Sequence, residues 1–163
     1  MEIKSKIQLR VTKDIVDITY KDIDSTEELG SNKPQQVHAY CFYQGKLVIV
    51  YTPRKAIWTP PGGGIEPGET VEQAVVREVL EETNMKVLKQ HLIGFQEIYE
   101  PGKVVIQTRS VCIVEPNGPF ISDPDGDITE IKLIEPSDYK KYFDWGSIGD
   151  RLMERAMELK KEF

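Results

Sequence analysis

Cysteine is scarce in this sequence, and hydrophobic runs of membrane-spanning length are absent from it. Cys41 and Cys112 are the only two cysteines among 163 residues, and each lies inside a short apolar run. Such neighbours favour buried, reduced thiols over a disulfide. The densest apolar run, KLVIVY at 46–51, has the length of a strand. We therefore expect neither a disulfide-stabilised scaffold nor a membrane-spanning protein.

Positive charge is also in short supply. The 21 lysines and arginines are outnumbered by 27 acidic residues, which gives a formal net charge of −6. This sign argues against general affinity for nucleic acid polymers or anionic membranes. A substrate that carries phosphates would need local cations or a bound metal to offset the repulsion. The N-terminus, MEIKSKIQLR, lacks the apolar centre of a signal peptide, so we expect a cytoplasmic protein.

The hydrophobic pattern predicts one α/β (α+β) domain over residues 1–163. Hydrophobic residues make up 39% of the chain, which is ordinary for a globular domain with its own core. Residues 1–36 are expected to form one or two N-terminal strands and a turn-rich connector. The pattern then predicts, in order, a hairpin turning at YQGK (37–52), a hairpin turning at Pro101–Gly102 (91–116), a polar loop (117–127), a short strand (130–134) and a C-terminal helix (146–163).

A helix is predicted between Thr70 and Asn84. Thr70 and Gln73 form a capping-box pattern at its start. Asparagine tolerates the left-handed conformation that closes a helix, so Asn84 marks the expected end.

Three glutamates of this helix, Glu78, Glu81 and Glu82, share one face at about 100° per residue. A merely solvated charged face would lie opposite the apolar stripe. On the same helical wheel, however, the residues within about 60° of Glu78 include Val71, Ala74, Val75 and Met85. Carboxylates beside a buried face need a cation or good hydrogen-bond donors. Because their oxygens suit hard divalent cations, we interpret this face as a metal site.

A glycine-rich segment, Gly62–Gly64, precedes the helix and is predicted to be a loop. Glycine lets the backbone approach a ligand closely. Backbone amides near a helix start suit phosphate, and exposed carbonyls suit a metal. Such a loop is weak evidence alone, but its fixed spacing from the acidic helix makes a phosphate and metal site a strong hypothesis.

These residues resemble the signature of the Nudix hydrolases. The positions that match it are Gly63, Glu69, Arg77, Glu78, Val79, Glu81, Glu82 and Met85. Asn84 stands where the family has glycine, which affects helix closure rather than chemistry. The resemblance implies one Nudix domain, an α/β/α sandwich around a mixed β-sheet, with residues 63–85 as its signature loop and helix.

The resemblance also implies roles for these residues. The expected ligands of Mg²⁺ or Mn²⁺ are the carbonyl of Gly62 and the carboxylates of Glu78, Glu81 and Glu82. Glu69 and Arg77 are expected to form a structural ion pair that braces the loop against the helix. The implied activity is metal-dependent hydrolysis of the pyrophosphate linkage between a nucleoside diphosphate and a group X.

The general base of this reaction is expected to be a carboxylate. Glu81 and Glu82 of the helix are eligible. In many family members the base lies instead on the loop before a late strand, which is DPDGDITE here. Asp127 and Glu130 are the candidates in that loop, and solvated acidic residues without a catalytic role are the alternative.

Substrate contacts are expected from the segment before the helix. The backbone of Gly63 and Gly64 suits a phosphate group. Arg54, Lys55 and Trp58 lie just upstream and are candidates for contacts with phosphate and base. The alternative is that the two cations decorate a hairpin tip and that the tryptophan packs in the core.

A second group of candidates lies in the strand VVIQTRSVCIV. Gln107 and Arg109 share one face of this strand, which points either into the substrate pocket or to solvent. His38 and His91 stand at predicted strand starts, and we interpret both as structural.

The expected substrate is a nucleoside or deoxynucleoside triphosphate, cleaved to a nucleoside monophosphate and pyrophosphate. ADP-ribose or a nucleotide sugar is the alternative, because Pro101 follows Met85 by sixteen residues, a placement similar to that in ADP-ribose-cleaving members. A silent nucleotide-binding or sensing module is the non-enzyme alternative, although it would be expected to lack one of the metal carboxylates. The expected partner is this small molecule, and the resemblance also allows a homodimer.

Overall fold

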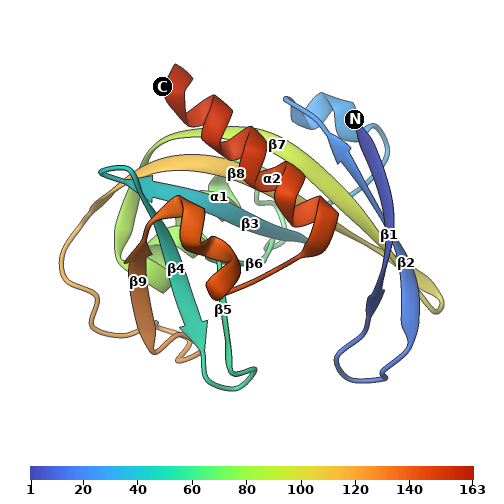
Figure 1. Cartoon of the computed structure of the whole chain (residues 1–163), viewed down its shortest axis with the longest axis horizontal. Coiled ribbons are helices and arrows are strands. Elements are labelled where there is room, and N and C mark those ends of the chain that lie inside the picture. Colours follow the sequence, from blue (N-terminus) through green and yellow to red (C-terminus); the bar gives the residue numbers. More distant parts are fainter.

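The apolar runs of the chain form nine strands of one sheet, with a helix on each of its faces (Figure 1). The computed structural model describes residues 1–163. The strands are β1 (Glu2–Gln8), β2 (Ile15–Asp22), β3 (Gln36–Tyr43), β4 (Lys46–Thr52), β5 (Ile57–Thr59), β6 (Gly62–Gly64), β7 (Met85–Glu100), β8 (Lys103–Pro116) and β9 (Glu130–Ile134). The helices are α1 (Val71–Thr83) and α2 (Gly146–Leu159), with short 3₁₀ helices η1 (Thr26–Leu29), η2 (Pro136–Lys141) and η3 (Lys160–Glu162).

The sheet is mixed. Its order is β1-β2-β7-β8-β3-β4-β5, with β6 paired to β3 and β9 paired to β4. The pairing of β3 with β8 is parallel and the others are antiparallel. The predicted α/β (α+β) class with a mixed sheet is therefore confirmed.

Alternation along β3 divides the core into two layers, as successive side chains of a strand point to opposite faces. Val37, Ala39 and Cys41 belong to the cluster beneath α1. Tyr40 and Phe42 belong to the cluster beneath α2. Figure 1 shows α2 across the near face of the sheet and α1 behind it. Strand β3 thus contributes side chains to both core layers.

The two cysteines lie opposite each other on the parallel strands β3 and β8. Cys41 and Cys112 are both free and fully buried. Burial and a contact with Cys112 raise the pKa of the Cys41 thiol well above its usual range. The prediction of buried, reduced thiols is confirmed.

Helix α1 begins and ends where its sequence predicts. The Thr70 hydroxyl accepts a hydrogen bond from the backbone amide of Gln73, and Oε1 of Gln73 accepts one from the backbone amide of Thr70. Asn84 closes the helix in the left-handed conformation, at φ 54°. The chain then enters β7 directly.

The segment Gly62–Gly64 is a strand, so the prediction of a loop was wrong. It pairs with β3 as β6, and a side chain at Gly62 would collide with the carbonyl of Val37. Three successive glycines let this backbone lie against its neighbour, a contact that composition alone does not indicate.

The remaining predicted elements are present. The hairpin turns fall at Gln44–Gly45 and Pro101–Gly102, and residues 2–22 form the β1–β2 hairpin at one edge of the sheet. None of the helices combines the length and the apolar character needed to cross a membrane.

Candidate active site

Arg77, in the middle of α1, joins the helix to the glycine strand. Its Nε and Nη2 donate to the two carboxylate oxygens of Glu69 at 2.7 and 2.8 Å. This bidentate contact lowers the pKa of Glu69 to about 2. Nη2 also donates to the carbonyl of Gly64 at 2.8 Å. Gly64, expected to contact substrate, thus contacts Arg77 and lines neither of the two cavities described below.

Glu78 packs against the same strand. A Cβ at Gly63 would lie 2.5 Å from Oε1 of Glu78, so a side chain at this position would require the carboxylate to move. Arg77 Nη1 donates to Glu78 at 2.8 Å and to Glu81 at 3.4 Å. Burial nevertheless raises the pKa of both carboxyl groups, against the lowering effect of Arg77. One guanidinium is shared among several carboxylates, and the face remains short of positive charge.

Glu82 is the most deeply buried of the three glutamates, with 8% of its surface exposed. Its Oε1 accepts a hydrogen bond from the amide of Gly62 at 2.7 Å. Burial raises the pKa of Glu82 to about 8 despite this bond. Because the carbonyl of Pro61 and the amide of Ile65 bond to β3, both polar groups of Gly62 face away from β3. Its carbonyl is therefore free on the side of α1.

The donor set at this face suits a hard divalent cation. Carboxylate and carbonyl oxygens are the ligands that Mg²⁺ and Mn²⁺ prefer. The three carboxylates do not converge on one point, because Glu78 and Glu81 turn toward Arg77 and Glu82 turns toward Gly62. A complete protein cage is not required, since Mg²⁺ is usually held by one or two carboxylates with waters and substrate phosphates.

A cavity of about 200 Å³ opens beside Glu82. Its wall includes Gly63, the cations Arg54 and Lys55 of the β4–β5 turn, and Asp127. The structure thus brings together carboxylates and cations from three separate segments of the chain. Such a mixture can hold a phosphate group and its counter-cation side by side.

Glu130, the second base candidate from the acidic loop, lies outside this cavity. It is the first residue of β9, where pairing opposite Tyr51 leaves its side chain exposed. Asp127 precedes the strand and lines the cavity with Glu82. The geometry therefore separates two candidates that the sequence left equal.

Two further aspartates of this loop were not selected from the sequence. Asp123 is buried, and its carboxylate accepts from the amides of Asp125 and Ile128 at 3.0 and 3.2 Å, which fixes the loop. The charge of Asp125 contributes to the raised pKa values of Glu78 and Glu81. The Asp-x-Asp-Gly spacing typical of an Asx turn was the available signal.

A larger cavity of about 580 Å³ adjoins the first one. The residues that line both cavities are His38, Lys55, Ile57 and Thr59. The two cavities therefore lie side by side, and we refer to them together as the cleft, whose size is common for small-molecule sites.

Gln107 and Arg109, predicted to share a strand face, both line the larger cavity. Oε1 of Gln107 accepts from Gln96 at 2.8 Å and from Arg109 at 2.9 Å, while its amide donates to Gln36 at 2.6 Å. Only 3% of the Arg109 surface is exposed, and burial lowers its pKa to about 10. The guanidinium is therefore still charged at neutral pH, inside a wall of amides.

A family model decides the identity that this site indicates. The model of the NUDIX domain matches residues 32–155, which contain the glycine strand, α1 and the acidic loop. The chain belongs to the Nudix family.

Curated Nudix relatives match part of the chain. It is 36% identical over 62 residues to the uncharacterized Nudix hydrolase YvcI of Bacillus subtilis (strain 168), over 37% of this chain and 39% of YvcI. It is 31% identical over 90 residues to the phosphatase NudJ of Escherichia coli (strain K12), over 50% of this chain and 56% of NudJ. The chain thus spans about two fifths to just over half of these relatives.

One solved structure matches nearly all of the fold. The crystal structure of a mutant of the Bacillus subtilis pyrophosphohydrolase BsRppH has a TM-score of 0.68, covering 94% of this chain and 96% of that one at 19% identity. At this identity the likeness concerns the fold alone.

Trp145 is a residue of this Nudix site that sequence reasoning missed. It lies just before α2, lines the larger cavity and sits with its ring 5.2 Å from the guanidinium of Arg109. Its ring is also edge-on to His38 at 6.0 Å. His38, interpreted as structural, lines both cavities. No local pattern in the sequence indicates these contacts between distant segments.

Trp58, expected at the substrate, lines neither cavity. Because side chains alternate along β5, Ile57 and Thr59 line the cavities while Trp58 points the other way. There its ring packs 5.1 Å from Tyr51 and 6.0 Å from Tyr142. The alternative of a packing role applies to this tryptophan.

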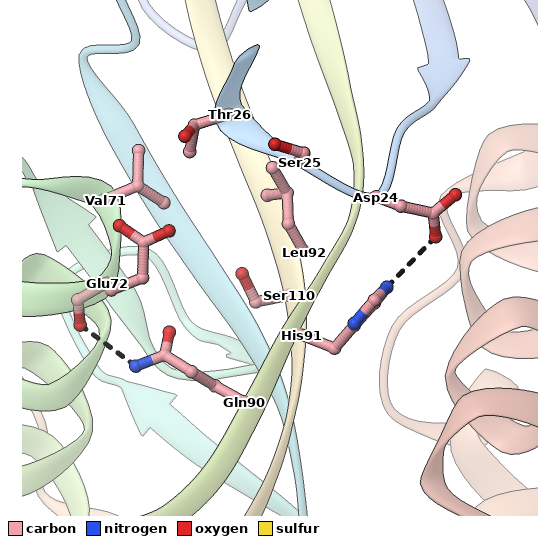
Figure 2. Close-up of a pocket in the computed structure, with 9 residues that line it drawn as sticks. All are labelled: Asp24, Ser25, Thr26, Val71, Glu72, Gln90, His91, Leu92 and Ser110. Carbon is pink, nitrogen blue, oxygen red and sulfur yellow. Dashed lines mark hydrogen bonds and ion pairs between the residues drawn. The ribbon is translucent and has the colours of Figure 1, made fainter. Parts of the chain in front are cut away.

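A third cavity, of about 190 Å³, lies between the start of α1 and β7 and is lined by none of the predicted site residues (Figure 2). Nε2 of His91 lies 3.0 Å from a carboxylate oxygen of Asp24, which also accepts from Arg155 at 2.7 Å. Gln90 donates to the carbonyl of Glu72 at 3.2 Å. The side chains of His91, Asp24 and Gln90 thus already have partners within the protein.

Proposed function

We propose that this protein hydrolyses the pyrophosphate linkage of nucleoside and deoxynucleoside triphosphates, releasing a nucleoside monophosphate and pyrophosphate. The observation that carries the proposal is the buried Glu82 carboxylate beside Arg54 and Lys55 in one small cavity. The adjoining larger cavity offers space for a nucleoside. Membership of the Nudix family agrees with this class of reaction.

Each segment of the cleft has a part in the reaction. Arg54 and Lys55 offset phosphate charge, which a chain of net charge −6 otherwise repels. Gly63 keeps the backbone close enough for Glu78 to remain at the site. Residues Gly62, Glu78, Glu81 and Glu82 would hold Mg²⁺ or Mn²⁺. When bound, such a cation supplies charge neutralisation and a lowered pKa of water.

Asp127 is the proposed general base. It lines the small cavity, and no protein group forms a hydrogen bond with its carboxylate that would compete for the proton. Glu82 shares the cavity, but one of its oxygens already accepts from Gly62. An Asp127→Asn variant should lower kcat by roughly 100-fold or more, whereas Glu130→Gln should leave kcat within about twofold.

Two features weigh against the alternative functions. Pro101 lies in the β7–β8 turn, beside Gly102 at φ 78°, and lines neither cavity of the cleft. The hint of ADP-ribose or nucleotide-sugar cleavage thus has no support from a contact. A silent binding module would be expected to lack a metal carboxylate, and all three glutamates are present.

The test is a panel of nucleotides with Mg²⁺, read by released phosphate products. The panel contains common and oxidised (d)NTPs, ADP-ribose, nucleotide sugars and dinucleoside polyphosphates. We expect triphosphates to be hydrolysed fastest, and a Glu82→Gln variant to lose roughly 100-fold or more of kcat. Glu72→Gln, on an exposed position of the same helix, is the matched control. No turnover across the panel, without stabilisation by Mg²⁺, would exclude the enzyme and favour a binding module.

A further inference from the structure

Cations gather around the larger cavity, although the chain as a whole is acidic. Four basic side chains line it, Lys6, Arg10, Lys55 and Arg109. Asp144 is the one acidic residue of its lining, and a carboxylate oxygen of Asp144 already accepts from the amide of Gly146 at 2.9 Å. The local balance of charge is therefore the reverse of the net charge of −6.

Arg109 is the buried member of this set. Its Nη1 and Nη2 donate to the neutral oxygens of Thr108 and Gln107, at 3.1 and 2.9 Å, and its Nε has no hydrogen-bond partner. No carboxylate of the protein pairs with this guanidinium. A buried cation is costly unless an anion accompanies it. This guanidinium lines the cavity without a carboxylate partner, which points to an anionic group of a ligand.

Two of the cations come from the N-terminal hairpin, which lies outside the residues 32–155 that match the family. Lys6 is on β1 and also pairs with Asp17 of β2 at 2.6 Å. Arg10 lies in the β1–β2 turn, and its Nη1 contacts the carbonyl of Lys55 at 3.5 Å. The hairpin thus adds a basic wall to the cleft, next to the β4–β5 turn that borders the small cavity.

We propose that the larger cavity binds a second phosphoryl group, carried on the ribose of the nucleotide and remote from the scissile pyrophosphate. The orientation of the bound nucleotide in this proposal rests on the proposed function, which places the pyrophosphate in the small cavity beside Glu82. The ribose then lies along the shared wall of His38, Ile57 and Thr59. A phosphoryl group on its 3′ side enters the basic region, where Arg10 and Arg109 offer forked donors.

The test compares AMP with adenosine 3′,5′-bisphosphate by isothermal titration on the full chain. We expect the bisphosphate to bind at least about tenfold more tightly, since each charge-assisted contact contributes on this scale. Arg10→Glu should remove most of that preference and leave the affinity for AMP within about twofold. Lys13→Glu is the matched control, because it makes the same charge change in the same turn but does not line the cavity.

The same phosphoryl group could be a terminal monoester or the diester of a second nucleotide. A third titration, with the 5′-phosphorylated dinucleotide pApA, distinguishes these sources. Tighter binding of the bisphosphate than of pApA identifies the monoester, and the reverse identifies the diester. Either order of affinity supports the second phosphoryl site if both ligands bind more tightly than AMP.

Equal affinity for AMP and the bisphosphate, or undetectable binding of both, overturns the proposal. An equal loss of preference in Lys13→Glu also overturns it, because a general charge effect then explains the result. The outcome is separable from the proposed function. Hydrolysis of triphosphates without this preference leaves the reaction intact, whereas the preference without hydrolysis leaves the binding site intact.

Discussion

One end of the cleft combines carboxylates with two cations, whereas the other end is lined mainly by cations. At the acidic end, one helix and one loop bring together six carboxylates: Glu78, Glu81, Glu82, Asp123, Asp125 and Asp127. At the basic end, four cations come from the hairpin, the β4–β5 turn and β8. Two short runs of carboxylates create the first region, whereas single cations from three separate parts of the chain create the second.

This difference explains how an acidic chain can accept a phosphorylated ligand. Six of the 27 acidic residues lie on the helix and loop where a metal cation is expected, and four basic side chains line the cavity next to them. Potentials inside a cleft depend on nearby charges more than on the total. Changes at each end should therefore affect different measurements.

Apart from loss of the carboxylates themselves, the largest effect is expected at the glycine strand of the acidic end. In Gly63→Ala the new Cβ would come 2.5 Å from Glu78 and displace its carboxylate. We expect kcat to fall by roughly 100-fold, as a displacement near 1 Å can have this effect. Gly64→Ala is the control, because the nearest atom outside its chain neighbours would lie 4.0 Å from its Cβ. Equal losses in both variants would contradict the importance of the Gly63–Glu78 contact.

The next effect is a pH dependence of stability in the absence of divalent cations. Burial raises the pKa of Glu82 to about 8 from its ordinary 4.5, so its favourable contribution is complete below 4.5 and is lost as the pH rises through 8. His38 has the opposite dependence, because burial lowers its pKa and its contribution is lost as the pH falls below 6.5. The window from pH 6.5 to 8 therefore reports mainly on the glutamates. The pKa values of Glu78 and Glu81 are raised as well, so their contributions to stability change with pH in the same direction as that of Glu82.

Across this window the free energy of unfolding should decrease by about 1 to 2 kcal/mol. Urea unfolding at a series of pH values in EDTA measures it. Glu82→Gln should flatten the dependence, and excess Mg²⁺ should reduce it by pairing with the ionised carboxylates. A dependence that is unchanged in Glu82→Gln would assign the titration to another group.

The two ends also differ in how much the sequence could predict. Capping residues and helical periodicity are local, so α1, its caps and its glutamate face followed from residues 70–84 alone. Arg77 and Glu69 were matched through the family signature in the same stretch. The acidic end was therefore largely predictable before its contacts were known.

The basic end was not predictable in the same way. Lys6 and Arg10 are ordinary charged residues of an N-terminal hairpin, and only the sheet order brings them to Arg109. The alternation of side chains along a strand determined the placement of other candidates. One step along β5 directs Trp58 away from the cleft and Thr59 into it. Pairing of β9 likewise left Glu130 outside, although it stands only three residues from Asp127.

A smaller effect is expected from Arg109→Met at the basic end. Removing a buried cation that has no carboxylate partner should leave the melting temperature unchanged or raise it. The KM for a nucleoside triphosphate that also carries a 3′-phosphoryl group should rise about tenfold, because that second group loses its charged donor. Thermal unfolding and initial rates measure the two quantities. A large loss of stability would mean that Arg109 serves the core and not the ligand.

The smallest expected effect is a difference in fluorescence between the two tryptophans of the chain. Trp145 contacts Arg109 inside the larger cavity, whereas Trp58 packs against Tyr51 and Tyr142 outside it. Nucleotide binding should quench the fluorescence of Trp145 and leave that of Trp58 unaltered. Trp58→Phe should therefore keep the quenching and change KM by less than about twofold, while Trp145→Phe should abolish it. Quenching that survives in Trp145→Phe would place the nucleotide next to Trp58, and the basic cavity would then lose its assigned role.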